Sequence, residues 1–159
     1  MPKPDMTLNV NVQVTGAIDD DGGMTVTKSY TQGATTPASD NVVDSTGDIN
    51  LGNMDDSNNA YSNRTDITFL LSGTATDPQG HSYPIVFPSS VDSAITIAKH
   101  GSGGNGQLVP SLLSFSSLKI DDTDNDGAHY NYCLTVQAQD LNHNGTNPTC
   151  RLDPMIVNR

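Results

Sequence analysis

The residues best suited to chemistry lie in a run of aspartates between positions 121 and 127. Three stand at alternate positions and a glycine closes the run: Asp122, Asp124, Asp126 and Gly127. Carboxylates spaced in this way can converge on a calcium ion where a glycine lets the chain turn sharply. A complete EF-hand loop also needs a bidentate acid at its twelfth position, which is Cys133 here. Two interpretations stay open: a looser calcium site completed by Asp121 or the aspartates at 19–21, and a solvated acidic turn.

Two Asp–Pro peptide bonds offer a different chemistry, Asp77–Pro78 and Asp153–Pro154. A carboxylate is an established covalent nucleophile, and an aspartate can attack its own peptide carbonyl when the departing nitrogen belongs to proline. The plainer interpretation is that both dipeptides serve turns and strand ends, where Asp and Pro are common. Self-cleavage at an Asp–Pro bond is therefore an alternative function.

No other arrangement in the sequence indicates catalysis or a cofactor. The histidines are dispersed, and no two have the spacing of a metal-ligand pair: His81, His100, His129 and His143. No serine lies in a Gly-x-Ser-x-Gly turn. Calcium is thus the one cofactor that the sequence suggests, and a non-enzymatic role is the preferred interpretation.

The two cysteines, Cys133 and Cys150, flank a turn signal at 140–145. A hairpin through that turn would bring them opposite each other, so a disulfide is favoured over two thiols. A catalytic thiol is the least favoured interpretation, because Cys133 stands in mid-strand with no cationic neighbour to lower its pKa.

The acidic run leads into the clearest strand of the sequence, at 129–138, which we place at the centre of an antiparallel sheet. One face is apolar: Tyr130, Tyr132, Leu134, Val136 and Ala138. The other is polar: His129, Asn131, Cys133, Thr135 and Gln137. This strict alternation predicts a half-buried strand.

Shorter stretches repeat the pattern and predict further strands at 6–14, 24–30, 67–74, 83–87, 95–97 and 150–157. The first two form a hairpin, and a type I turn begins at Asp77. Residues 112–120 fit either a strand with a bulge, in which Leu113 and Phe115 serve the apolar face, or a helix. Residues 31–66 lose the alternating pattern and hold only a short apolar patch at 42–51, which could form a short strand. We expect a partly ordered excursion that packs on a partner or on its own sheet, with a mobile loop as the alternative.

The composition suits a β-protein with long polar loops, since 34% of residues are hydrophobic and only 16% are charged. A net charge of −11 with seven basic residues argues against nucleic acid and anionic membrane surfaces. The chain contains no signal peptide and no apolar run long enough to span a bilayer. These features favour an extracellular, cell-surface or virion location over the cytoplasm.

Two resemblances concern the C-terminal third. Residues 126–133, Asp-Gly-Ala-His-Tyr-Asn-Tyr-Cys, resemble the Asp-x-Ala-x-Tyr-x-Cys pattern of immunoglobulin-type domains, although the cysteine comes one residue late and the chain has no Trp. Leu-Thr-Val at 134–136 and the turn at 73–80 also resemble bacterial surface immunoglobulin-like and PKD-type repeats. Leu-Asp-Pro-Met-Ile-Val-Asn at 152–158 resembles the end of the DP-EP family of small bacterial β-proteins, which includes self-assembling and self-cleaving members.

We therefore expect residues 1–159 to form one all-β domain, a single antiparallel β-sandwich or jelly roll of about eight short strands with long polar loops. The expected function is a structural, assembly or adhesion-type module that forms a homo-oligomer; the alternatives are self-cleavage and calcium-dependent binding. Pairing of Cys133 and Cys150 in register would put Leu152 and Ile156 on an outer face, where exposed apolar side chains indicate a partner subunit.

Overall fold

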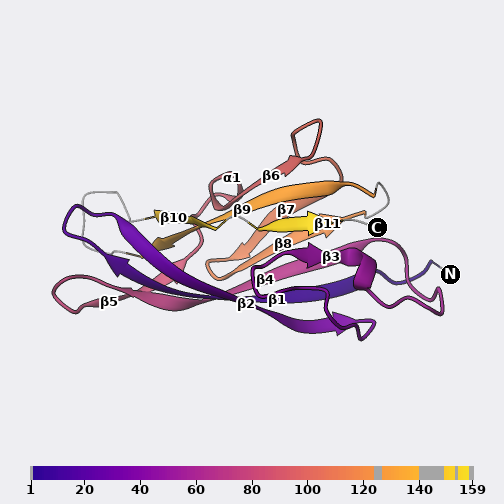
Figure 1. The fold of residues 1–159 in the computed structure, drawn as a ribbon, viewed down its shortest axis with the longest axis horizontal. Helices are drawn as coiled ribbons and strands as arrows, with labels where there is room; N and C mark the ends of the chain where they lie inside the picture. Colours follow the sequence, from indigo (N-terminus) through magenta and orange to yellow (C-terminus); the bar gives the residue numbers. More distant parts are fainter. Residues whose placement is uncertain (1, 124–126, 140–148, 153, 158–159) are drawn as a thin grey trace.

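A computed structural model describes residues 2–123, 127–139, 149–152 and 154–157. The described chain is mostly β with very little helix, as the sequence predicts (Figure 1). Its elements are β1 (Met6–Ile18), β2 (Met24–Thr36), β3 (Ile49–Asn50), the 3-10 turn η1 (Leu51–Asn53), β4 (Thr65–Thr76), β5 (Ser82–Val86), α1 (Val91–Ala94), β6 (Ile95–Lys99), β7 (Leu108–Ser114), β8 (Ser117–Asp122), β9 (His129–Ala138), β10 (Thr149–Leu152) and β11 (Met155–Val157).

The strands form one mixed sheet rather than a wholly antiparallel one. β1 and β2 make the predicted N-terminal hairpin, but β1 also pairs in parallel with β4 over twelve residues, from Met6 opposite Thr65 to Ala17 opposite Thr76. The parallel pairing arises because residues 37–64 carry the chain back to the start of β1. β8 and β7 continue this half of the sheet beyond β4.

β9 lies at the centre of the other half, as its alternating sequence predicts. Tyr130 is paired with Lys99 of β6 on one side and with Ile156 of β11 on the other. β5 and β10 extend the same two sides, and all four partners are antiparallel to β9. The predicted faces are confirmed, since Tyr130, Tyr132, Leu134, Val136 and Ala138 are buried while the alternate residues are exposed or half-buried.

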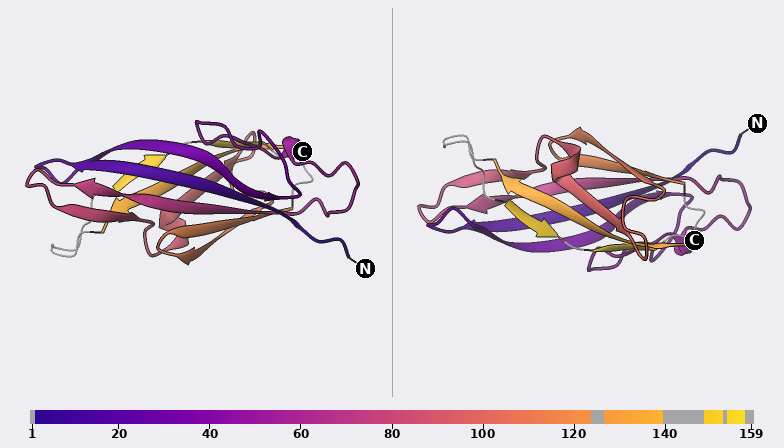
Figure 2. Two further views of the ribbon diagram at one scale, coloured as in Figure 1. Left: turned by 90° about the horizontal axis from the view of Figure 1, so that it is seen from below. Right: turned by 90° about the horizontal axis from the view of Figure 1, so that it is seen from above.

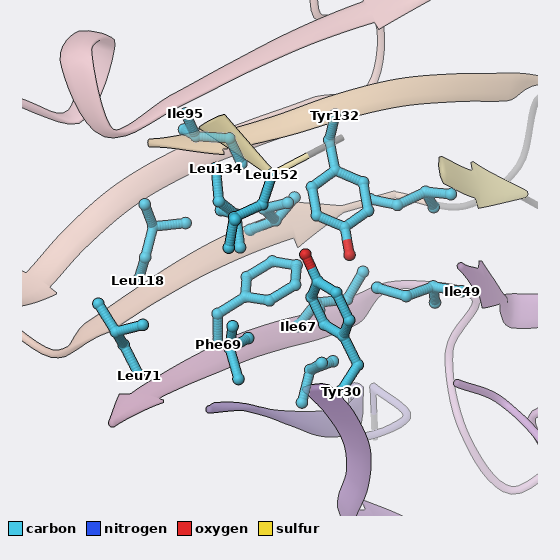
Figure 3. Close-up of a cluster of buried hydrophobic side chains, with 14 of the residues drawn as sticks. Tyr30, Ile49, Ile67, Phe69, Leu71, Ile95, Leu118, Tyr132, Leu134 and Leu152 are labelled. Carbon is cyan, nitrogen blue, oxygen red and sulfur yellow. The ribbon is translucent and has the colours of Figure 1, made fainter. Parts of the chain in front are cut away.

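The sheet curls through β5, which pairs with β4 and with β9, so that its two halves enclose one core (Figure 2). Phe69 of β4 meets Tyr132 of β9 across this core, with ring centroids 5.2 Å apart (Figure 3). The two halves thus bury each other's apolar face, which is the main source of stability for such a sheet.

The excursion at 31–66 packs on its own sheet. β2 extends through its first six residues, and Val42, Ile49, Leu51 and Met54 are buried in the common core. The amide of Gln32 fixes the crossing chain, since its oxygen accepts hydrogen bonds from the backbone N–H groups of residues 42 (2.7 Å) and 43 (3.1 Å). This segment therefore covers part of the common core and belongs to the same domain as the sheet.

Candidate interaction surface

Of the three aspartates proposed to bind calcium, only Asp122 lies among the described residues. Asp122 ends β8, is fully buried and is paired with Thr65 of β4; Asp124 and Asp126 lie outside the described residues. The neighbouring Asp121 forms an ion pair with Arg64, with Nε and Oδ1 3.0 Å apart. Among the described residues, no group of three or more His, Cys, Asp or Glu side chains is placed to hold a metal ion.

The turn at 19–21 cannot complete that site. Met6, at the start of β1, is opposite Thr65 and hence near Asp122, whereas the turn follows the other end of β1. Thirteen residues of strand span roughly 40 Å. In the turn, the Asp19 carboxylate instead accepts hydrogen bonds from the backbone N–H groups of residues 21 and 23.

The Asp77–Pro78 bond lies in the turn between β4 and β5, where the Asp77 carboxylate is fully engaged. It accepts hydrogen bonds from the backbone N–H groups of residues 79 (3.0 Å) and 81 (2.8 Å), and from the Tyr83 hydroxyl (3.1 Å), and it lies 3.1 Å from His81 Nδ1. Partial desolvation raises the pKa of Asp77, but the hydrogen bonds from His81 and Tyr83 outweigh it and lower the pKa. This carboxylate stabilises a turn through these hydrogen bonds.

Asp153, in the other candidate bond, lies outside the described residues. Pro154 is buried, and its carbonyl accepts a hydrogen bond from the backbone N–H of Tyr132 at 3.1 Å. Pro154 thus continues the ladder of β9 between β10 and β11.

The two cysteines are not opposite each other. Cys150 is paired with Val136, and Cys133 with Thr96 of β6. Three residues along a strand span about 10 Å, more than the roughly 7 Å between Cα atoms that a disulfide tolerates. The expected in-register pairing is therefore wrong, because β10 lies three residues further along β9 than the hairpin would require.

The apolar outer face expected at Leu152 and Ile156 is also wrong. Both side chains are fully buried, since Leu152 is opposite Leu134 and Ile156 is opposite Tyr130 on the inner face. A partner surface must be sought elsewhere.

Four large apolar side chains are exposed among the described residues, and they share one region of the sheet. We call them the β7 patch: Leu70 (40% exposed), Val109 (62%), Leu113 (58%) and Phe115 (60%). Val109 and Leu113 belong to β7, Phe115 to the turn that follows it, and Leu70 to β4 opposite Ser117. Polar residues lie between them, since Val109 is opposite Asp121 of β8 and Leu70 is opposite Ser117. Exposed apolar side chains concentrated on one part of a sheet nevertheless indicate an interaction site.

Local backbone structure turns Leu113 and Phe115 outward. The register between β7 and β8 shifts between Leu112 and Ser114, so Leu113 falls in a bulge instead of serving the apolar face. The turn after it is held in place, since the Phe115 carbonyl accepts a hydrogen bond from Phe87 N and the Ser116 carbonyl from Leu71 N, both at 2.8 Å. The two exposed side chains are accordingly presented on a fixed backbone.

A hollow of about 430 Å³ adjoins this turn. It is lined by Ser89 and by residues 112–115, so its walls are mostly apolar. The β7 patch therefore combines protruding side chains with a depression next to them, a shape that one protein surface can share with another.

The β7 patch also lies in the least acidic part of the chain. No acidic residue occurs between Asp92 and Asp121, although the whole chain carries a net charge of −11. Lys99 and Lys119 are the charged residues in that interval, and Lys119 Nζ lies 3.6 Å from Asp66 Oδ2. This gap in the acid distribution and the broken alternation at 112–115 were the signals available in the sequence for the patch.

No protein-family model and no curated protein matches the chain. Among solved structures, the chain is similar to the crystal structure of the inclusion body protein PixA from Burkholderia cenocepacia, over 99% of this chain and 98% of that one, with a TM-score of 0.40 and 8% identity. A TM-score this low supports no inference. Within the described ranges, no helix is long and apolar enough to cross a bilayer.

Proposed function

We propose that this protein is a non-enzymatic structural module, a curled β-sandwich that self-associates through the β7 patch. The observation that carries the proposal is that all four exposed large apolar side chains of the described residues belong to β4, β7 and the turn after β7. The C-terminal resemblance to the DP-EP family, which includes self-assembling members, supports the same function.

The charge distribution favours a second copy of the chain as the partner. Two copies with a net charge of −11 each repel one another, and they can approach most closely where few acids are unpaired. Residues 93–120 contain no acid, and the two acids beside the patch are ion-paired, Asp121 with Arg64 and Asp66 with Lys119. Since salt screens the repulsion between exposed charges, salt should strengthen the association. A complex held together by attraction between opposite charges would instead weaken as salt is added.

The contact is expected to be made by side chains rather than by adding a strand to the sheet. β7 pairs with β8 alone among the described strands, so its other edge is open. Pro110 removes a donor from that edge and the bulge at Leu113 interrupts it, two features that discourage edge-to-edge pairing. We therefore expect the two copies to meet through the side chains of the β7 patch, on the face of the sheet beside this edge.

The apolar area predicts a concentration-dependent dimer. Burying the exposed parts of the four side chains on each of two copies contributes roughly 7–13 kcal/mol. Association costs roughly 4–15 kcal/mol in translational and rotational freedom. The gain exceeds the lower values of this cost by up to about 9 kcal/mol, and a surplus of roughly 4–8 kcal/mol corresponds to dissociation constants from millimolar to micromolar. We therefore expect a weak dimer in that range.

Sedimentation velocity from about 10 µM to about 1 mM protein tests the proposal. We expect the weight-average mass to rise with concentration, and to rise further when NaCl is raised from about 0.05 M to about 0.5 M. The double variant Leu113→Ser, Phe115→Ser should remain monomeric. Gln13→Ser, which shortens an exposed side chain on β1, is the matched control and should behave as the native protein.

A native chain that stays monomeric at about 1 mM in high salt would refute self-association. Association that persists in the double variant would show that another surface is used. Circular dichroism should confirm that the double variant is folded, because both replaced side chains are exposed and contribute little to the core.

A further inference from the structure

Two histidines far apart in the sequence meet on the outer surface of the sheet. Lys99 of β6 is paired with Tyr130 of β9, so the next residue, His100, lies opposite His129. The backbone N–H of His100 donates to the His129 carbonyl at 2.9 Å and extends the ladder by one step. Their ring centroids are 5.8 Å apart, with the ring planes at 46°.

This spacing suits two imidazoles that share one metal ion. A metal–nitrogen distance of about 2.0–2.1 Å puts each ring centroid about 3.2 Å from the ion, so tetrahedral ligands have centroids about 5 Å apart. The observed 5.8 Å requires only a small change in side-chain torsion. Both side chains are exposed, so water can complete the coordination shell.

A neighbouring amide selects the tautomer of His100 that a metal needs. His100 Nε2 lies 3.1 Å from Asn131 Oδ1, and an amide oxygen only accepts hydrogen bonds. Nε2 therefore carries a proton, and in the neutral ring the free lone pair is on Nδ1. An oriented second hydrogen bond of this kind is the usual companion of a metal-ligating histidine.

The surroundings define what the pair can bind. Lys99 is paired with the inward-facing Tyr130, so it lies on the opposite face from His100. Cys133 is four residues beyond His129 on the same strand, roughly 13 Å away, too far to share the ion. The ligand set is thus two neutral imidazoles, which late first-row divalent metals prefer over calcium or magnesium.

We propose that His100 and His129 form a two-histidine binding site for a late first-row divalent metal ion, Zn²⁺, Ni²⁺ or Cu²⁺. The site joins β6 to β9 on the outer face and is independent of the β7 patch. The net charge of −11 raises the local concentration of cations around the protein and favours occupancy.

Isothermal titration with ZnCl₂, together with NMR of the histidine rings, tests the proposal. We expect one Zn²⁺ per chain, with the ring resonances of His100 and His129 shifting. Either His100→Ala or His129→Ala should weaken binding at least about tenfold, because the second bond is then no longer intramolecular. His81→Ala, which removes another exposed histidine, and Cys133→Ser are the controls and should bind as the native chain does.

The proposal is overturned if the double variant His100→Ala, His129→Ala binds Zn²⁺ as tightly as the native protein. It is equally overturned if neither ring responds at millimolar Zn²⁺. Since both side chains are exposed, the variants should fold normally, and an unchanged melting temperature without metal will verify this.

Discussion

Replacing Tyr132 with phenylalanine removes one buried hydroxyl group and leaves the aromatic ring in place. That hydroxyl donates a hydrogen bond of 2.7 Å to the carbonyl of Gly47, and the side chain is fully buried. It thereby links the central strand β9 to the loop between Val43 and Ile49. Figure 3 shows it directed toward the hydroxyl of Tyr30, which comes from β2 on the other side of the core.

The expected cost follows from the carbonyl that loses its donor. A buried acceptor without a partner costs about 1–3 kcal/mol. For a chain of this size, each kcal/mol lowers the melting temperature by about 2–4 °C. Tyr132→Phe should therefore lower it by roughly 3–10 °C. Tyr83→Phe is the matched control, because its hydroxyl bonds to Asp77 in a surface turn, and it should cost less than about 0.5 kcal/mol.

The pH dependence gives a second readout. Burial raises the pKa of Tyr132 well above its usual value, and Tyr30, Asp48 and Asp44 raise it further. A tyrosine in the unfolded chain titrates near pH 10. The native state thus favours the neutral hydroxyl, so the contribution is complete below about pH 10 and is lost as pH rises from there toward the folded pKa.

Urea unfolding followed by circular dichroism, at pH 7 and between about pH 10 and pH 11, measures both effects. In the native protein, the free energy of unfolding should fall by up to about 1.4 kcal/mol per pH unit from Tyr132 alone, and this slope should be absent in Tyr132→Phe. The reasoning fails if the variant matches the native protein at pH 7 and retains the full alkaline slope.

Two further predictions concern Gly73 and the Asp77–Pro78 bond. Gly73 has φ +134°, and an added Cβ would collide with the Val14 carbonyl, so Gly73→Ala should cost more than about 4 kcal/mol in urea unfolding; Gly80→Ala has positive φ but open space and should cost about 1–2 kcal/mol. Equal losses would contradict the collision. The bond between Asp77 and Pro78 should stay intact at neutral pH, because the carboxylate is committed to the turn; intact mass spectrometry showing fragments that end at residue 77 would revive self-cleavage.

Side-chain alternation was enough to identify most strands and their faces. In β9 and in residues 6–14 of β1, apolar and polar residues alternate without a break, and the strand period of two then determines which side chains enter the core. The turn at Asp77 was equally local, since Asp, Pro and Gly fit a type I turn within four residues. Such features depend on neighbours in the chain, so the sequence contains them directly.

The pairing of strands that are distant in the sequence could not be predicted from neighbouring residues. The parallel pairing of β1 with β4 depends on where a long crossing segment returns. The sequence predicted a partly ordered excursion at 31–66, but it did not show that the segment contributes four side chains to the core. The outward position of Leu113 depends on a one-residue bulge that alternation alone does not reveal. The candidate interaction surface was missed for this reason.

By itself, the sequence determined the all-β class, the two faces of β9, the acid-rich character and the turn chemistry, because each follows from composition or from neighbours in the chain. Only the tertiary structure decided register. It separated Cys133 from Cys150, placed Leu152 in the core and brought His100 beside His129. Register is set by long-range packing of the two halves of the sheet, and a shift of a few residues along β9 would have assigned different partners to each of these side chains.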